Sequence, residues 1–219
     1  MVSCDMSNIE LRVLTFHKER FEMLRGTSIR SVQLQAFDDV SLTFVTQNTL
    51  PAFTEIRLQG TYLTDFNHTL PPTLQLIILQ EGSCSSDWLY SLMLKLSTLN
   101  HAVRVYLAEY VVLQRREAIE KDHEPLMRGA DLSSVKLEVF KDCPGLYKTL
   151  PTMHITSLNM TKIEHTDLLS QTLPRLTHLQ QLRICLNKYD TEMKLPECIK
   201  YVFIIYKKSV TIITATICE

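Results

Sequence analysis

The sequence has few glycines, no excess of charge of either sign and no long apolar run. Only five of its 219 residues are glycine, too few for the glycine-rich loops that hold phosphate in nucleotide-binding proteins. The formal net charge of −1 provides no field to attract nucleic acid. The longest apolar stretch, residues 201–206, predicts a buried strand, because a membrane-spanning helix needs roughly 20 residues. We therefore expect neither nucleic acid nor a membrane as a partner.

Cysteine is present without the spacing that would give it a chemical role. The six cysteines form no C-x-x-C pair, and no histidine stands at zinc-finger spacing. We expect buried free thiols in a reducing compartment. Asp5 and Glu10 occupy the N-terminal region where a secretory signal needs a basic start and an unbroken apolar segment. The sequence therefore predicts a cytoplasmic protein.

Catalytic motifs are also absent. Neither G-x-S-x-G nor H-E-x-x-H occurs. The seven histidines are scattered along the chain, and isolated histidines are usually solvated or capping groups. A Cys-His catalytic pair stays open, because its members need not be close in sequence. We expect a protein that is not an enzyme and that uses no metal, cofactor or small-molecule substrate.

What the sequence does have is a period. Five of the eight prolines directly follow a leucine, at 50–51, 70–71, 150–151, 173–174 and 195–196, whereas random pairing would give about one such pair. Each pair precedes a hexad of the form L-x-x-L-x-L. Hexads with apolar first, fourth and sixth residues begin 18 to 30 residues apart, at Leu11, Ile29, Phe53, Leu74, Ala102, Leu132, Ile155, Leu179 and Ile199. Because about a dozen loose hexads would arise by chance, the Leu-Pro pairs are the independent signal of a repeat.

Each hexad predicts a short strand with its first, fourth and sixth side chains in the core and the others facing solvent. Stacked strands would form a parallel sheet on the concave side of a solenoid, and the segments between them, the returns, would close its convex side. Proline suits a return because it would interrupt the hydrogen bonds of a strand. Two returns, at 85–96 and 166–173, have helical apolar spacing after capping residues. The β-branched stretch 210–218 predicts one more strand.

On these residues the chain resembles leucine-rich-repeat proteins over residues 11–204, best at 70–79 and 173–187. The resemblance implies an α/β fold, a single leucine-rich-repeat solenoid over residues 1–219 with about nine irregular repeats and mixed helical and irregular returns. The irregular spacing is similar to the intracellular receptor-like and plant-resistance-like kinds. It also implies an Asn or Cys after each hexad that bonds neighbouring turns. Asn187 fills that place, where the other hexads have Thr61, Gly82, Phe140 or Ile163.

We expect a non-enzymatic recognition module that binds a partner protein of unknown identity on the concave face. Arg and Tyr are enriched at interface hot spots, although the same residues would equally serve to solvate a sheet face. The mixed-charge block 114–125, within the longest interval between hexads, predicts a solvated helix face or a binding excursion. The candidate contacts are the solvent-facing hexad residues Arg30, Gln33, Glu55, Arg57, Arg104, Tyr106, Lys136, Gln181, Arg183, Lys200 and Tyr201.

Two other functions remain open. The first is a low-signature α/β enzyme with a doubly wound sheet, which would need right-handed crossovers of about 30 residues, and most intervals here are shorter. The second is a substrate-adaptor subunit of a ubiquitin ligase. It would need an F-box-like helical segment, for which the ten residues before Leu11 are too few.

Overall fold

The computed structural model describes residues 5–13, 19, 22–35, 52–109, 111–114, 131–187, 193–206 and 211–216, with the backbone alone for Gln114 and residues 211–216. Three sequence predictions lie outside these residues. They are the mixed-charge block beyond Gln114, the Leu50-Pro51 pair, and the hexad residues Leu14 and Phe16.

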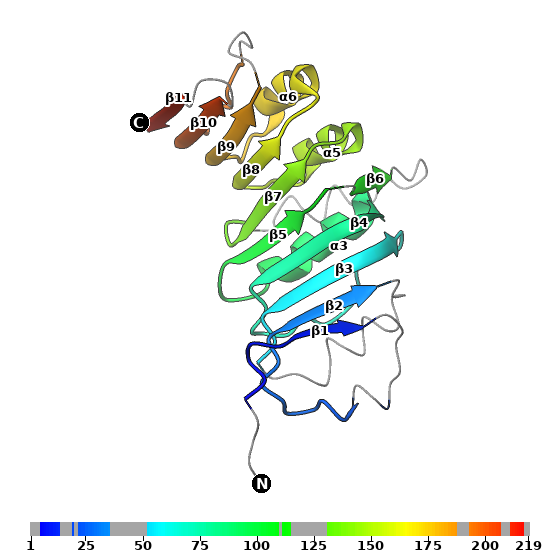
Figure 1. Ribbon diagram of the computed structural model, residues 1–219. Coiled ribbons are helices and arrows are strands. Elements are labelled where there is room, and N and C mark those ends of the chain that lie inside the picture. Colours follow the sequence, from blue (N-terminus) through cyan, green and yellow to red (C-terminus); the bar gives the residue numbers. More distant parts are fainter. Residues whose placement is uncertain are drawn as a thin grey trace.

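One 11-stranded sheet runs the length of the molecule (Figure 1). Its strands follow one another in chain order, except that β6 pairs with β4. Neighbours from β1 to β10 are parallel, and β11 is antiparallel to β10. The predicted α/β class is therefore confirmed. The strands are β1 (Glu10–Val13), β2 (Ser31–Gln35), β3 (Glu55–Tyr62), β4 (Leu76–Ser85), β5 (Val103–Leu107), β6 (Val112–Gln114), β7 (Val135–Lys141), β8 (Ser157–Lys162), β9 (Gln181–Leu186), β10 (Tyr201–Tyr206) and β11 (Thr211–Thr216).

The register of the sheet aligns the inward positions of successive strands. Ile56 pairs with Ile77 and Leu58 with Leu79, and the same two columns continue to β10. Because side chains alternate along a strand, both columns lie on one face. From β2 to β9 they are buried, with Val202 of β10, in a single hydrophobic cluster that also holds the apolar sides of the helices, and Ile204 packs against it. The predicted core positions are thus confirmed for most of the chain.

The predicted frame of the first hexad is wrong, and so is one predicted core position, Ala102. Leu11, rather than Leu14, pairs with Val32, so the first hexad is displaced by three residues. Ala102 is exposed rather than buried. Apolar residues occupy 45% of the sequence, so several frames satisfy the hexad, and only backbone pairing with the neighbouring strand selects one.

The hexad predicted from Leu132 is also out of frame. Leu137, rather than Val135, pairs with Leu158 of the next strand, so the unit begins two residues later than predicted. The shift moves the fifth, solvent-facing position of this unit to Glu138. Because the predicted hexad was two residues out of frame, the prediction did not place Glu138 on the solvent-facing surface of the sheet.

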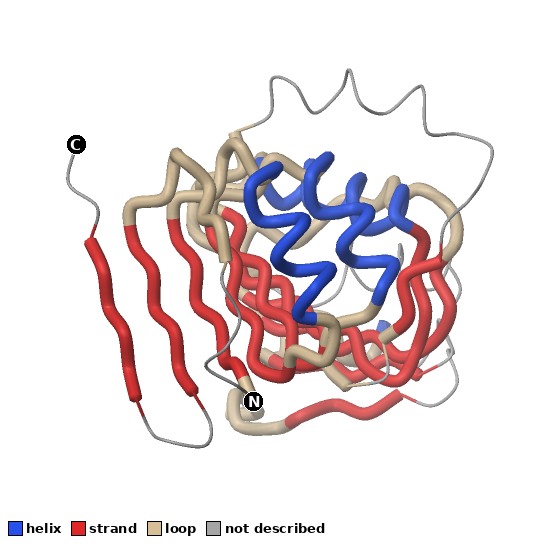
Figure 2. Tube along the Cα trace, turned by 90° about the horizontal axis from the view of Figure 1, so that it is seen from above, coloured by secondary structure: helices blue, strands red, loops and turns tan. Residues whose placement is uncertain are grey.

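The helices cover one face of the sheet (Figure 2). The Ser85 hydroxyl accepts a hydrogen bond of 3.0 Å from the backbone N–H of Trp88, which caps the first helix as the sequence predicts. Trp88 then packs against the rings of Tyr62 and Phe66, with centroids 5.0 and 5.7 Å away. Both predicted helical returns are confirmed. The helical elements are α3 (Ser86–Ser97), α5 (Pro144–Thr149), η1 (Leu150–Thr152), α6 (Thr166–Thr172) and η2 (Leu173–Arg175).

The leucine of each described Leu-Pro pair anchors its return. Leu150 and Leu173 open the 3-10 turns η1 and η2 and are fully buried. Leu70 and Leu195 pack against the core from its margin. Proline at the second position of such a turn has no N–H to leave unpaired, which explains why the pair recurs.

A buried carboxylate links two successive turns beneath the sheet. Asp142 accepts hydrogen bonds from the backbone N–H groups of Glu164 (2.8 Å) and His165 (2.9 Å) and from the Tyr147 hydroxyl (2.5 Å). In the corrected frame Asp142 stands where the resemblance implies a turn-bonding side chain, so the choice of Phe140 for that place is wrong. The bonds fix the end of β7 relative to the return that follows β8.

Asn187 plays the matching role one turn later. Its side-chain amide donates to the carbonyl oxygen of Ile163 at 3.4 Å, 24 residues back along the chain. The prediction that Asn187 bonds a neighbouring turn is therefore confirmed. Together with Asp142, it holds β7, β8 and β9 in a fixed order.

The opposite face of the sheet carries none of the described helices. We call it the open face, and it consists of the side chains that alternate with the two core columns, from Glu10 on β1 to Phe203 on β10. The prediction of a buried strand at residues 201–206 is wrong in part, because Tyr201 is 54% exposed there. Within the described residues no helix is long and apolar enough to cross a membrane.

Candidate binding surface on the open face

The open face gathers nine of the eleven predicted contact residues. They alternate with core residues along β2, β3, β5, β7, β9 and β10, so their side chains share one surface. Arg30 and Lys200 directly precede β2 and β10 and are exposed at the margin of this surface. The nine are Gln33, Glu55, Arg57, Arg104, Tyr106, Lys136, Gln181, Arg183 and Tyr201.

The N-terminal part of the face is neutralised by its own charges. The Arg57 Nε atom lies 2.7 Å from the Glu55 carboxylate and 3.6 Å from that of Glu10. Arg12 lies 3.9 Å from the same Glu10. Exposed pairs of this kind add little stability, but they leave Arg57 and Glu55 engaged with each other. These two predicted contacts are therefore less suited to a partner than their exposure suggests.

The central part of the face places two cations side by side. Arg104 on β5 and Lys136 on β7 are partners in the parallel register, and both are exposed. Like charges opposite each other on neighbouring strands destabilise a sheet. Among the described residues, neither side chain has a carboxylate within ion-pair distance. This pair offers an uncompensated positive charge to solvent.

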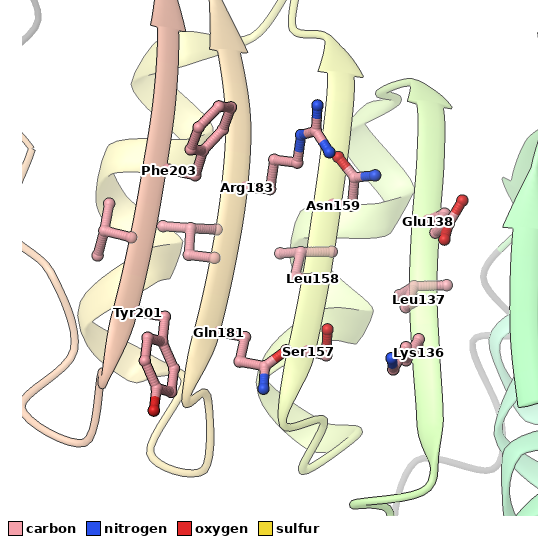
Figure 3. Close-up of a pocket in the computed structure, with 12 residues that line it drawn as sticks. Lys136, Leu137, Glu138, Ser157, Leu158, Asn159, Gln181, Arg183, Tyr201 and Phe203 are labelled. Atoms are coloured by element: carbon pink, nitrogen blue, oxygen red, sulfur yellow. The ribbon is translucent and has the colours of Figure 1, made fainter. Parts of the chain in front are cut away.

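A third cation stands beside an aromatic ring near the C-terminal end. The Arg183 guanidinium lies over the Phe203 ring, 4.9 Å from its centroid. On the other side, Asn159 of β8 is its register partner, and the two side chains point toward each other (Figure 3). The buried Asn159 Oδ1 atom has no hydrogen-bond partner within the described chain. The site thus combines an oriented cation with an unused acceptor.

These groups line a hollow of about 290 Å³ across β7 to β10. A second hollow of about 290 Å³ adjoins it, shares Asn159 and Arg183, and has the apolar lining of Phe140, Met160 and Ile205. The first hollow is bordered mainly by polar and charged side chains, and the second adds apolar surface beside it. The side chains of the first hollow that alternate with the core are Lys136, Glu138, Ser157, Asn159, Gln181, Arg183, Tyr201 and Phe203.

Sequence reasoning missed four residues of the first hollow, Glu138, Ser157, Asn159 and Phe203. Ser157 is the register partner of the predicted contact Gln181. Glu138 was hidden by the frame error in its hexad. Asn159 and Phe203 occupy the same fifth hexad position as Arg183, so the rule that selected Arg183 would have found both. Glu138 also influences its neighbour, because burial and then the Glu138 carboxylate raise the pKa of Tyr106.

The described residues offer little material for metal or thiol chemistry. They contain no group of three His, Cys, Asp or Glu residues placed to hold a metal ion. Cys84 is fully buried, and burial raises the pKa of its thiol to about 12. A thiol with that pKa carries almost no thiolate at neutral pH and is a poor nucleophile.

Comparison of the chain with protein-family models, curated proteins and solved structures finds no match.

Proposed function

We propose that this chain is a leucine-rich-repeat-type solenoid that recognises a partner protein on its open face, without catalysis. The solenoid is supported by strands that pair in chain order and by the turn-bonding side chains of Asp142 and Asn187. The open face corresponds to the concave surface that the repeat predicts. Buried, unpaired Cys84 is consistent with a cytoplasmic, reducing setting.

The observation that carries the proposal is the group of three exposed cations Arg104, Lys136 and Arg183 on a hollowed sheet face. Within the described residues, none has a carboxylate partner. Arg57 on the same face, by contrast, is paired with Glu55. Arg104 and Lys136 stand opposite each other on β5 and β7, where like charges destabilise a sheet, and a bound partner would relieve that repulsion.

The aromatic residues add a second reason. Tyr201 and Phe203 border the hollow beside Arg183, and Tyr, Phe and Arg are enriched in the cores of protein interfaces. A half-buried Phe203 ring next to a guanidinium supplies apolar contact area and an oriented charge at one place. A small hydrophilic ligand would use little of this apolar contact area, whereas a partner protein would use both the ring and the charge.

The test compares two triple variants with equal changes of charge. One replaces Arg104, Lys136 and Arg183 by Glu on the open face. The other replaces Lys95, Lys148 and Arg175 by Glu, which are exposed on the helical side. Each variant and the unaltered chain are used for affinity purification from cells that express the protein. We expect partner proteins with the unaltered chain and the helical-side variant, and their loss with the open-face variant.

Circular dichroism of both variants confirms that each is folded before the comparison. Equal retention of every partner by the two variants would contradict the proposal, as would loss of partners from the helical-side variant alone. Equal retention would mean that the partner does not bind through the three cations. Loss from the helical-side variant alone would mean that it binds the helices.

A further inference from the structure

We infer that the open face binds an extended acidic segment of its partner, with two carboxylates about four residues apart. One carboxylate would lie on Arg183 and the other on the Arg104–Lys136 pair. This inference rests on the proposed function and specifies the chemistry of the partner.

The charge distribution selects an acidic ligand. From β5 to β10, the residues of the open face include three cations and a single carboxylate, Glu138, although the whole chain has a net charge of −1. The N-terminal part of the same face, by contrast, pairs Arg57 with Glu55 and Glu10. Positive charge is therefore in excess on this part of the face, with Lys136 and Arg183 in the hollow and Arg104 beside Lys136. Complementary charge is what steers and orients a partner there.

Arg183 is prepared to hold a carboxylate. Its guanidinium rests over the Phe203 ring, a contact that restricts the side chain before binding. A planar guanidinium binds a carboxylate through two parallel hydrogen bonds. The neighbouring Phe203 surface lowers the local exposure to water, and this strengthens the ion pair relative to one on an open surface.

The sheet geometry sets the spacing of the two carboxylates. The midpoint of the Arg104–Lys136 pair lies two and a half strand intervals of about 4.8 Å from β9, or about 12 Å, and Arg183 is offset from that row by two residues, about 6.6 Å, along the strand. The two charged positions are therefore roughly 14 Å apart. An extended peptide rises about 3.3 Å per residue, so four residues span this distance. Residues four apart also project from the same side of an extended chain. A peptide crossing the strands thus places both carboxylates on the cations at once.

Asn159 on β8 lies between the two carboxylate-binding positions, Arg183 on β9 and the Arg104–Lys136 pair on β5 and β7. Glu138 lies next to Asn159 in the register. A nucleic acid strand, with a phosphate at every residue, would bring negative charge against Glu138. A peptide with neutral residues between its two carboxylates avoids that repulsion.

The experiment selects a library of random dodecapeptides displayed on phage against the intact chain. We expect enrichment of sequences with Asp or Glu at positions four apart. A synthetic selected peptide is then titrated by fluorescence polarisation. Arg183→Gln should weaken its binding at least tenfold, whereas Arg175→Gln on η2 and the already neutralised Arg57→Gln should change it less than twofold.

Three results would overturn the inference. Selected peptides without paired carboxylates that still lose binding in Arg183→Gln would refute the acidic segment but agree with the proposed function. Failure to enrich any sequence would refute a linear segment as the ligand, while the triple-variant purification separately decides the proposed function. Tighter binding of a dodecathymidylate strand than of the selected peptide, lost in Arg183→Gln, would identify nucleic acid as the ligand class.

Discussion

Replacing Asp142 by alanine should destabilise the chain strongly, because its fully buried carboxylate bonds two turns. The side chain is 0% exposed and accepts three hydrogen bonds of 2.5 to 2.9 Å. Hydrogen bonds to a charged group contribute about 1.5–3 kcal/mol each. Water reaches the partly buried backbone donors, so the losses do not add in full. We expect the free energy of unfolding to fall by about 3–5 kcal/mol, somewhat less than three such hydrogen bonds would contribute together.

The pH dependence of this contribution has a definite sign. Burial opposes ionisation of Asp142, but hydrogen bonds from Tyr147, Glu164 and His165, with the charge of His165, hold its pKa below the usual value. A carboxylate with a lowered pKa stabilises the folded state fully above its unfolded pKa of about 3.9. The contribution is lost as the pH falls below about 4. Asp142→Asn lacks this titration, so its stability deficit relative to the unaltered chain should shrink in acid.

The assay is urea unfolding followed by fluorescence of the single, buried Trp88, with circular dichroism to establish whether both signals change together. Asp142→Asn keeps one acceptor oxygen and should cost less than Asp142→Ala. Asp167→Ala on the exposed first turn of α6 is the control and should cost less than about 1 kcal/mol. A loss below about 1 kcal/mol for Asp142→Ala would refute the reasoning.

Three further predictions use the same unfolding measurements. In Gly82→Ala the new Cβ would overlap the backbone carbonyl of Gly60, so we expect a loss of about 1–3 kcal/mol; unchanged stability would mean that β3 and β4 separate there at no cost. Asn187→Ala removes one long hydrogen bond of 3.4 Å and should cost about 0.5–1.5 kcal/mol, clearly less than Asp142→Ala. Trp88 is fully buried against Tyr62 and Phe66, so its emission should be blue-shifted in the folded chain and Trp88→Ala, followed by circular dichroism, should cost about 3–5 kcal/mol; emission already at the solvent wavelength would contradict the packing.

Much of the fold could be predicted because it depends on local patterns. The capped helix that begins at Ser86 needs only a capping hydroxyl and an apolar face at helical spacing, and both are visible in sequence. The Leu-Pro pairs are equally local, since proline and its anchoring leucine act within one turn. The antiparallel direction of β11 is different, because it depends on the connection after β10 and on an edge that only the assembled sheet provides.

The frame of each strand could not be predicted, because a strand's register is a property of its neighbour. Leu132, Val135 and Leu137 all satisfy the apolar pattern, and pairing with Leu158 decides between them. That single choice determines whether Glu138 is seen as part of the surface and whether Asp142 is seen as a turn-bonding residue. Both were missed for the same reason.

The sequence predicted most residues of the candidate site, but not which of its cations are paired with carboxylates in the folded chain. Arg57 and Arg183 are alike in sequence, each at the fifth position of its hexad. Their difference lies largely in neighbours from other strands, since Arg57 lies near Glu10 of β1 and Arg183 lies over Phe203 of β10. These two pairings join residues 20 or more positions apart, beyond the reach of any local pattern, whereas the pairing of Arg57 with Glu55 lies within β3.

Site-specific photocrosslinking tests the central claim, recognition through the open face, most directly. A photoreactive benzoylphenylalanine is introduced in living cells either at Gln181, exposed in the hollow between β8 and β10, or at Lys95, exposed on α3. Recognition through the open face predicts a light-dependent adduct with a partner protein at Gln181 and none at Lys95. An adduct at Lys95 with none at Gln181 would contradict it.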